Sequence, residues 1–239
     1  MLRLRWSATR WTLPRLGTRA WWIAAVALAA LAPGLLVGVP IAARAAEPAV
    51  VIPPPALDNP KAPGPTQTAV LAGGCFWGVQ GVYQHVRGVQ RVLSGYAGGT
   101  KATADYEAVS RGNTGHAESV EIRFDRKKIS YPQLLDVFWH NVDPLTADAQ
   151  FCDHGNQYRT AIFYHDEEQR QLALASMREL QKRFKEPIVT QIVPASEFWP
   201  AEAYHQDYYK KNPIRYRFYR FNCGRDARLE QVWGKAPEH

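Results

Sequence analysis

The chain has 239 residues, of which 46% are hydrophobic and 12% aromatic, enough for one ordinary packed domain. Its formal net charge is +7, but six of the basic residues are arginines within residues 1–45, a segment without acidic residues. Residues 46–239 therefore carry a net charge of only +1, from 23 basic and 22 acidic side chains. This balance argues against a nucleic-acid-binding domain.

Residues 1–45 have the three parts of a secretory signal: an Arg-rich start, an apolar run over 21–40 and a small-residue pattern before Ala46. A run of about 20 apolar residues is also long enough to span a bilayer. The sequence thus predicts a signal peptide or an N-terminal membrane anchor, and in both cases a periplasmic location for the rest of the chain. A Pro-rich linker is predicted over 46–66 and the folded domain over 67–239.

The folded part mixes strands and helices. Hydrophobic periodicity predicts strands at 68–72, 89–94, 119–125, 160–164 and 189–193, and helices at 76–86 and after the caps Ser130 and Asp166. This order predicts an α+β fold of the split βαβ, ferredoxin-like kind, with a mixed sheet and flanking helices. A long irregular, aromatic-rich C-terminal tail is expected to follow.

Three cysteines, Cys75, Cys152 and Cys223, all fall in the part predicted to be exported. In an oxidising compartment an odd number leaves at least one thiol outside any intrachain pair. Cys75 follows Gly73-Gly74 where a strand is predicted to end and a helix to begin. Because a helix N-terminus stabilises a thiolate, we expect a lowered pKa and a nucleophile at Cys75. A small buried residue at a strand–helix junction is the alternative.

Five short motifs follow one another along the domain. They are Gly-Cys-Phe-Trp-Gly at 74–78, Gly-Tyr-Ala-Gly-Gly at 95–99, Gly-Asn-Thr-Gly-His-Ala-Glu at 112–118, Asp-His-Gly-Asn-Gln-Tyr-Arg at 153–159 and Tyr-His-Gln-Asp-Tyr at 204–208. With these motifs, residues 67–212 resemble the methionine sulfoxide reductase A family, the peptide-methionine (S)-S-oxide reductases. The resemblance implies reduction of the S epimer of methionine sulfoxide, free or in proteins, and hence repair of oxidised exported proteins.

Reducing a sulfoxide without a metal requires a soft nucleophile for the sulfur, an acid for the oxygen and an apolar slot for the methyl group. Cys75 suits the first role. The resemblance assigns the acid to Glu118, which burial would keep protonated by raising its pKa. Phe76 and Trp77 are predicted to form the methyl slot.

Further polar residues match the family. The resemblance implies that the hydroxyls of Tyr106 and Tyr158 help hold the sulfoxide oxygen, since a phenol is a donor that stays neutral at working pH. Asp153 matches an aspartate of the same hydrogen-bond network. Tyr216 falls near a substrate-contacting tyrosine of the family. No His-Glu-x-x-His or paired-cysteine motif is present, so no metal is predicted.

The expected reaction leaves a sulfenic acid on Cys75, and a second thiol condenses with it to form a disulfide. An external thioredoxin-like dithiol protein then reduces that disulfide, with no bound cofactor. Many family members carry the resolving cysteine in a glycine-rich tail shortly after Lys-Asn-Pro, whereas here nine residues separate Pro213 from Cys223. Cys223 is the favoured resolver and Cys152 the alternative. A third interpretation is a structural Cys152–Cys223 disulfide, with Cys75 reduced directly by an outside thiol.

Two other functions compete with a reductase. A thiol peroxidase would use the same cysteine and prefer a hydroperoxide to a sulfoxide. A non-catalytic module would hold peptides on the aromatic tail around residues 198–209. For the reductase we expect a monomer that acts on oxidised proteins, peptides and free methionine sulfoxide.

Overall fold

The computed structural model describes residues 66–235. The predicted leader and the linker up to residue 65 lie outside the described residues, so both stay predictions. Within the part that is described, no helix is long and apolar enough to cross a membrane.

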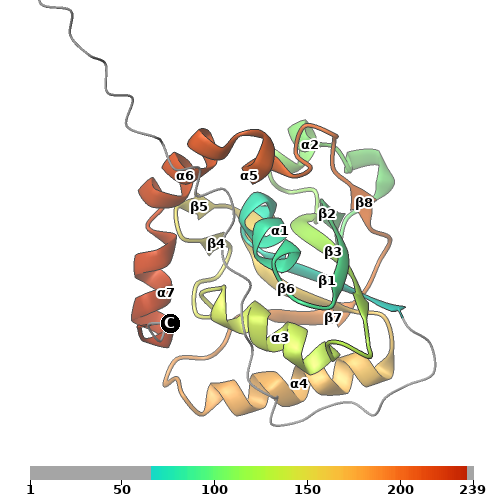
Figure 1. Ribbon diagram of the computed structural model, residues 1–239, viewed down its shortest axis with the longest axis vertical. Coiled ribbons are helices and arrows are strands. Elements are labelled where there is room, and N and C mark those ends of the chain that lie inside the picture. The colour runs from blue at the N-terminus through green and yellow to red at the C-terminus, as the bar shows by residue number, and fades with distance from the viewer. Residues whose placement is uncertain (1–65, 236–239) are drawn as a thin grey trace, which may run out of the picture. The chain divides into compact units, whose positions relative to one another are not determined.

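A six-stranded sheet forms the centre of the domain (Figure 1). Its strands are β1 (Thr66–Gly73), β2 (Val89–Ala97), β3 (Ala117–Asp125), β6 (Thr160–Tyr164), β7 (Gln191–Pro194) and β8 (Trp199–Pro200). They lie in the order β7-β6-β1-β3-β2-β8, with β6 and β7 parallel and every other pair antiparallel. The predicted mixed sheet of an α+β fold is confirmed. The position of β3 between β1 and β2 supports the split βαβ interpretation, which stays a prediction.

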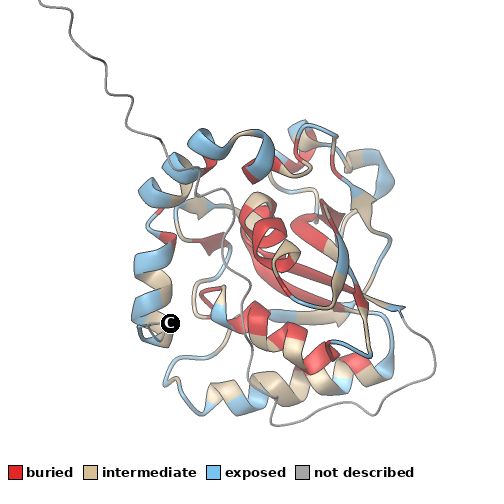
Figure 2. Ribbon diagram, viewed as in Figure 1, coloured by how far each residue is buried: buried red, intermediate tan, exposed pale blue. Residues whose placement is uncertain are grey.

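Three helices pack on the sheet, α1 (Phe76–Gln84), α3 (Tyr131–His140) and α4 (Glu167–Gln181), and α3 also packs on α4. The main core lies between them and the sheet and includes Leu71, Ile122 and Phe138 (Figure 2). The opposite face of the sheet is lined by small residues and Phe163, and Phe198 packs against it.

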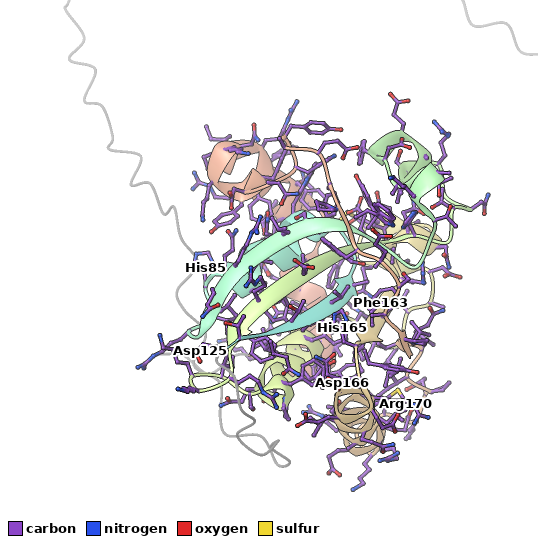
Figure 3. The ribbon with its side chains drawn as sticks, turned by 90° about the vertical axis from the view of Figure 1, so that its right-hand side faces the viewer. His85, Asp125, Phe163, His165, Asp166 and Arg170 are labelled. Carbon is purple, nitrogen blue, oxygen red and sulfur yellow. A yellow bond between two sulfur atoms is a disulfide. The ribbon has the colours of Figure 1, made fainter. Side chains whose placement is uncertain are left out.

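Local signals start two of these helices. Ser130 and Gln133 form the capping box that the sequence predicts for α3. Asp166 accepts a hydrogen bond from the backbone N–H of Gln169 at 2.8 Å and so begins α4. His165, Asp166 and Arg170 follow one another from the end of β6 into this helix (Figure 3).

Short elements carry several of the predicted site residues. They are the 3-10 helices η1 (Lys101–Thr103) and η2 (Asn156–Tyr158), the helix α2 (Tyr106–Ser110), and the hairpin of β4 (Ala149–Gln150) and β5 (Asp153–His154). The periodicity gave no sign of them because each is shorter than the window over which an apolar repeat is visible.

The expectation of an irregular C-terminal tail was wrong. Residues 208–233 contain α5 (Tyr208–Lys211), α6 (Pro213–Asn222) and α7 (Arg225–Trp233) (Figure 1). Pro213 begins α6 at a position where a proline is tolerated, and Gly224 in the left-handed conformation (φ 65°) separates α6 from α7. Trp233 anchors the end of α7 by donating a hydrogen bond to the Val142 carbonyl at 3.0 Å.

Candidate active site

Cys75 lies at the junction between β1 and α1, as the sequence predicts, and the glycine pair before it is a packing requirement. A side chain at Gly73 would come within 2.9 Å of Val142. Gly74 has φ +82°, and a Cβ there would lie 2.5 Å from the Cβ of Gln150. Only glycine fits both the left-handed backbone and this close approach. The thiol is therefore held where β1, the β4 segment and α1 meet.

The pKa of Cys75 differs from the expectation. The thiol is only 8% exposed, and this burial raises its pKa, with the negative charges of Glu118 and Asp153 adding to the shift. Hydrogen bonds from the Tyr219 hydroxyl and the Trp77 backbone N–H act in the opposite direction. Desolvation outweighs the helix N-terminus, so the predicted lowering of the pKa was wrong.

Glu118 is one reason why the pKa of Cys75 is raised and not lowered. It lies near the start of β3, is 3% exposed and accepts a hydrogen bond from the Phe76 backbone N–H at 3.0 Å. The Phe76 N–H at the start of α1 thus donates to the Glu118 carboxyl and not to the Cys75 thiol. Burial, with a smaller contribution from the charge of Asp153, raises the pKa of Glu118 to about 8 even though this hydrogen bond opposes the shift. At neutral pH the carboxyl is a neutral acid beside Cys75.

Two predicted tyrosines belong to the same electrostatic neighbourhood. Burial raises the pKa of both Tyr106 and Tyr158, and the charges of Glu118 and Cys75 add to each shift. Both hydroxyls therefore remain neutral donors at any working pH. Asp153, also predicted, lies in this group, and burial raises its pKa as well.

Tyr219, on α6, is a site residue that sequence reasoning missed. Its hydroxyl donates a hydrogen bond to Oδ2 of Asp153 and also acts to lower the pKa of the Cys75 thiol. Tyr219 precedes Cys223 by one helical turn, and its backbone carbonyl accepts the N–H of Cys223. Recognising this spacing would have required predicting a helix in a tail that was expected to be irregular.

Arg225, at the start of α7, is a second residue that the sequence did not reveal. Its side chain is buried, donates to the Asn141 carbonyl at 2.7 Å and lies 4.7 Å from the centre of the Phe151 ring. Its positive charge partly opposes the rise that burial causes in the pKa of Asp153. A buried cation from the C-terminal helices thus acts on Asp153, a carboxylate that also influences the pKa of Cys75.

The predicted methyl slot is built into an aromatic cluster. Phe76 is buried, with its ring 5.0 Å from that of His205. Trp77 stacks on Tyr208 at 3.7 Å and donates from Nε1 to Nδ1 of His205 at 3.0 Å. The indole is therefore fixed in orientation, as a shaped apolar wall requires.

Tyr216 is placed differently from the other predicted residues. It is 6% exposed and packs with Tyr208 and Tyr209, and its hydroxyl lies over Gly78 and Gly81 of α1. At Gly78 the close approach comes from Arg225, whose Nη1 would lie 2.8 Å from a Cβ there. A role in substrate contact stays a prediction for Tyr216.

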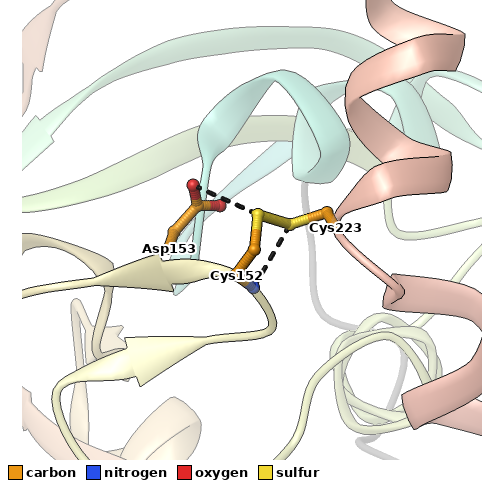
Figure 4. Close-up of side chains that lie close together, drawn as sticks. All are labelled: Cys152, Asp153 and Cys223. Carbon is orange, nitrogen blue, oxygen red and sulfur yellow. Dashed lines mark hydrogen bonds between the residues drawn. A yellow bond between two sulfur atoms is a disulfide. The ribbon is translucent and has the colours of Figure 1, made fainter. Parts of the chain in front are cut away.

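The other two cysteines form a disulfide, which leaves Cys75 as the free thiol among residues 66–235 (Figure 4). Cys152 lies at the tip of the β4–β5 hairpin and Cys223 between α6 and α7. With Asp153 they make the one grouping of metal-ligating side chains in the described residues. Its two sulfurs are bonded to each other, so it offers no thiolate ligands in this state.

Comparison with known proteins agrees with this geometry. The family model described as peptide methionine sulfoxide reductase matches residues 67–237. The chain belongs to this family. Its members are thiol-dependent oxidoreductases, and the resemblance drawn from the five motifs is confirmed.

Individual relatives cover the same domain. The chain is 46% identical over 171 residues to the peptide methionine sulfoxide reductase MsrA of Bacillus licheniformis, covering 71% of this chain and 94% of that protein. It is also 46% identical over 170 residues to the MsrA/MsrB protein of Vibrio cholerae, which covers 70% of this chain but only 45% of that longer protein.

Solved reductase structures show the same fold. Mxr1 from Saccharomyces cerevisiae in reduced form matches with a TM-score of 0.60 and 31% identity, covering 64% of this chain and 89% of that one. Methionine sulfoxide reductase A of Corynebacterium diphtheriae matches with a TM-score of 0.58 and 29% identity, covering 68% and 86%. Membership in the reductase family therefore rests on sequence and on fold together.

Proposed function

We propose that this chain reduces the S epimer of methionine sulfoxide, free or in proteins, with Cys75 as nucleophile and Glu118 as acid. The observation that carries the proposal is a buried free thiol beside a buried carboxyl whose pKa is raised to about 8. Such a pair supplies an electron donor for the sulfoxide sulfur and a proton for its oxygen. Family membership supplies the substrate class, and the epimer follows from the resemblance alone.

The first half-reaction transfers oxygen to Cys75. The sulfur of Cys75 attacks the sulfoxide sulfur while Glu118 gives its proton to the oxygen, held by the neutral hydroxyls of Tyr106 and Tyr158. Because burial raises the pKa of the thiol, Cys75 gives up its proton only as its sulfur attacks, and that proton passes to the carboxylate that Glu118 leaves. Collapse of the adduct releases the thioether methionine and leaves a sulfenic acid on Cys75, whose sulfur is oxidised by two electrons.

The second half-reaction restores Cys75 through the other two cysteines. Cys223 attacks the sulfenic sulfur, water leaves, and a Cys75–Cys223 disulfide forms. Cys152 then attacks Cys223 and releases Cys75 as a thiol. The product is the pairing seen in the structure, Cys152–Cys223 with Cys75 free. The effect of Tyr219 on the pKa of Cys75 supports this order, because Tyr219 and the C-cap Cys223 belong to the same helix, α6.

An external thioredoxin-like protein completes the cycle by reducing the Cys152–Cys223 disulfide. Its support is the exposure of Cys152 at the tip of the hairpin. The leader motif of residues 1–45 supports action on oxidised proteins in the periplasm, with the chain either secreted or anchored to the inner membrane.

The decisive experiment measures turnover of each methionine sulfoxide epimer by the full-length chain, with dithiothreitol as reductant. We expect reduction of the S epimer alone, no turnover by Cys75→Ser, and strongly slowed turnover by Glu118→Gln. Glu121→Gln makes the same change at a half-buried position of the same strand and should leave the rate unchanged. Absence of sulfoxide turnover, with rapid consumption of hydroperoxide, would instead identify a thiol peroxidase.

A further inference from the structure

The Cys152–Cys223 disulfide is chemically asymmetric, and this asymmetry bears on how it is reduced. The inference rests on the proposed function, in which an external dithiol reduces this bond. A reducing thiolate attacks one sulfur in line with the S–S bond and expels the other as a thiolate. The sulfur that is attacked must be accessible, and the sulfur that leaves must be the more stable anion.

Access distinguishes the two sulfurs. Cys152 is an exposed residue in the turn between β4 and β5. Cys223 is only 8% exposed, because it lies between α6 and α7 where the two helices meet. A macromolecular thiol therefore reaches Cys152 from solvent and not Cys223.

The polar groups around the two sulfurs also favour attack at Cys152 and departure of Cys223 (Figure 4). The backbone N–H of Cys152 points to Sγ of Cys223 at 3.2 Å, and a hydrogen-bond donor stabilises a thiolate there. Sγ of Cys152 instead lies 3.8 Å from Oδ1 of Asp153. A negative charge forming on Cys152 would face that carboxylate, whereas a charge forming on Cys223 faces an N–H group.

We propose that the external dithiol attacks Cys152 and that Cys223 is the leaving group. The first thiolate forms a mixed disulfide with Cys152, and Cys223 leaves as a thiolate with the electron pair of the broken S–S bond. The second thiol of the reductant then attacks the mixed disulfide and releases Cys152. The reductant ends as an intramolecular disulfide, and both protein sulfurs are reduced by the two electrons that it lost.

Trapping the mixed disulfide tests the inference directly. The full-length Cys75→Ser variant, oxidised to the Cys152–Cys223 disulfide, is mixed with a thioredoxin whose second active-site cysteine is replaced by serine. The reaction is quenched at once with N-ethylmaleimide. Trypsin places Cys152 in peptide 129–159 and Cys223 in peptide 221–225, so mass spectrometry reads directly which cysteine carries the thioredoxin and which carries the maleimide.

We expect thioredoxin on Cys152 and maleimide on Cys223. Because the exposed sulfur is the one a protein thiol reaches and the thiol of lower pKa leaves faster, the Cys152 adduct should exceed the Cys223 adduct by about tenfold. Asp153→Asn removes the carboxylate beside Cys152 and should reduce that excess. Thioredoxin found mainly on Cys223, or no mixed disulfide at all, overturns the inference.

The stability of Cys223 as a leaving thiolate can be measured separately. In the reduced Cys75→Ser background, Cys152→Ser leaves Cys223 alone and Cys223→Ser leaves Cys152 alone. The pH dependence of alkylation should give the lower thiol pKa to Cys223, and the reverse order would contradict the argument. Sulfoxide turnover by the wild-type chain with dithiothreitol is assayed separately. A chain that reduces sulfoxide but traps at Cys223 refutes only this inference, whereas one that reduces no sulfoxide refutes the proposed function.

Discussion

Glu118→Gln should strongly slow turnover and, at the same time, change how the stability of the folded chain depends on pH. The carboxyl is buried, and its pKa is raised from 4.5 to about 8. Between these pH values the folded chain holds a proton on Glu118 that the unfolded chain has lost. The contribution to stability is therefore full below about pH 4.5 and is lost as the pH rises through about 8.

The size of this effect follows from the shift. At about 1.4 kcal/mol per pKa unit, the shift corresponds to about 5 kcal/mol over the whole window, of which about 3.5 kcal/mol falls between pH 5 and 8. Glutamine has nearly the same shape, stays neutral and can still accept the hydrogen bond from the Phe76 N–H. Relative to wild type, the variant should become steadily more stable across this range.

The assay is urea unfolding of wild type, Glu118→Gln and the control Glu121→Gln at several pH values from 5 to 8.5, with the disulfide kept oxidised. Subtracting the free energy of unfolding of one protein from that of another at each pH cancels the contribution of every group that titrates alike in both. If the wild-type and Glu118→Gln curves run parallel within about 0.5 kcal/mol, burial does not keep Glu118 protonated and the acid mechanism fails. Loss of the acid should also slow turnover by about 10²–10⁴-fold.

Three further predictions concern the surroundings of Cys75. Tyr219→Phe removes a hydrogen bond that lowers the pKa of Cys75, so alkylation of this thiol by iodoacetamide should shift to higher pH, while Tyr164→Phe on β6 should leave the profile unchanged. Gly74→Ala forces a side chain into a left-handed backbone and a 2.5 Å contact, and should lower the free energy of unfolding by more than about 1 kcal/mol; an unchanged urea midpoint would refute the packing argument. Removing the disulfide, which joins residues 71 apart in sequence, in a double serine variant should cost about 4 kcal/mol under oxidising conditions, and the difference from wild type should shrink once reductant is added.

Local chemistry was sufficient for much of the fold. The strands were visible because alternation of apolar residues reflects which side chains face the core. The start of α3 was visible because Ser130 and Gln133 bond each other's backbone within one turn. Likewise the glycine pair before Cys75 marked a tight turn into α1. Each of these signals lies within a few residues of the feature that it specifies.

The sequence by itself determined the family and singled out Cys75 and Glu118 as the predicted nucleophile and acid, because their residues stand in short motifs along one chain. The tertiary structure alone decided the environment of the thiol. It brought Tyr219 to Asp153, 66 positions away, and paired Cys223 with Cys152. It also reversed the expected pKa shift of Cys75, because that pKa depends on how much water the whole fold excludes, and no local pattern encodes that quantity.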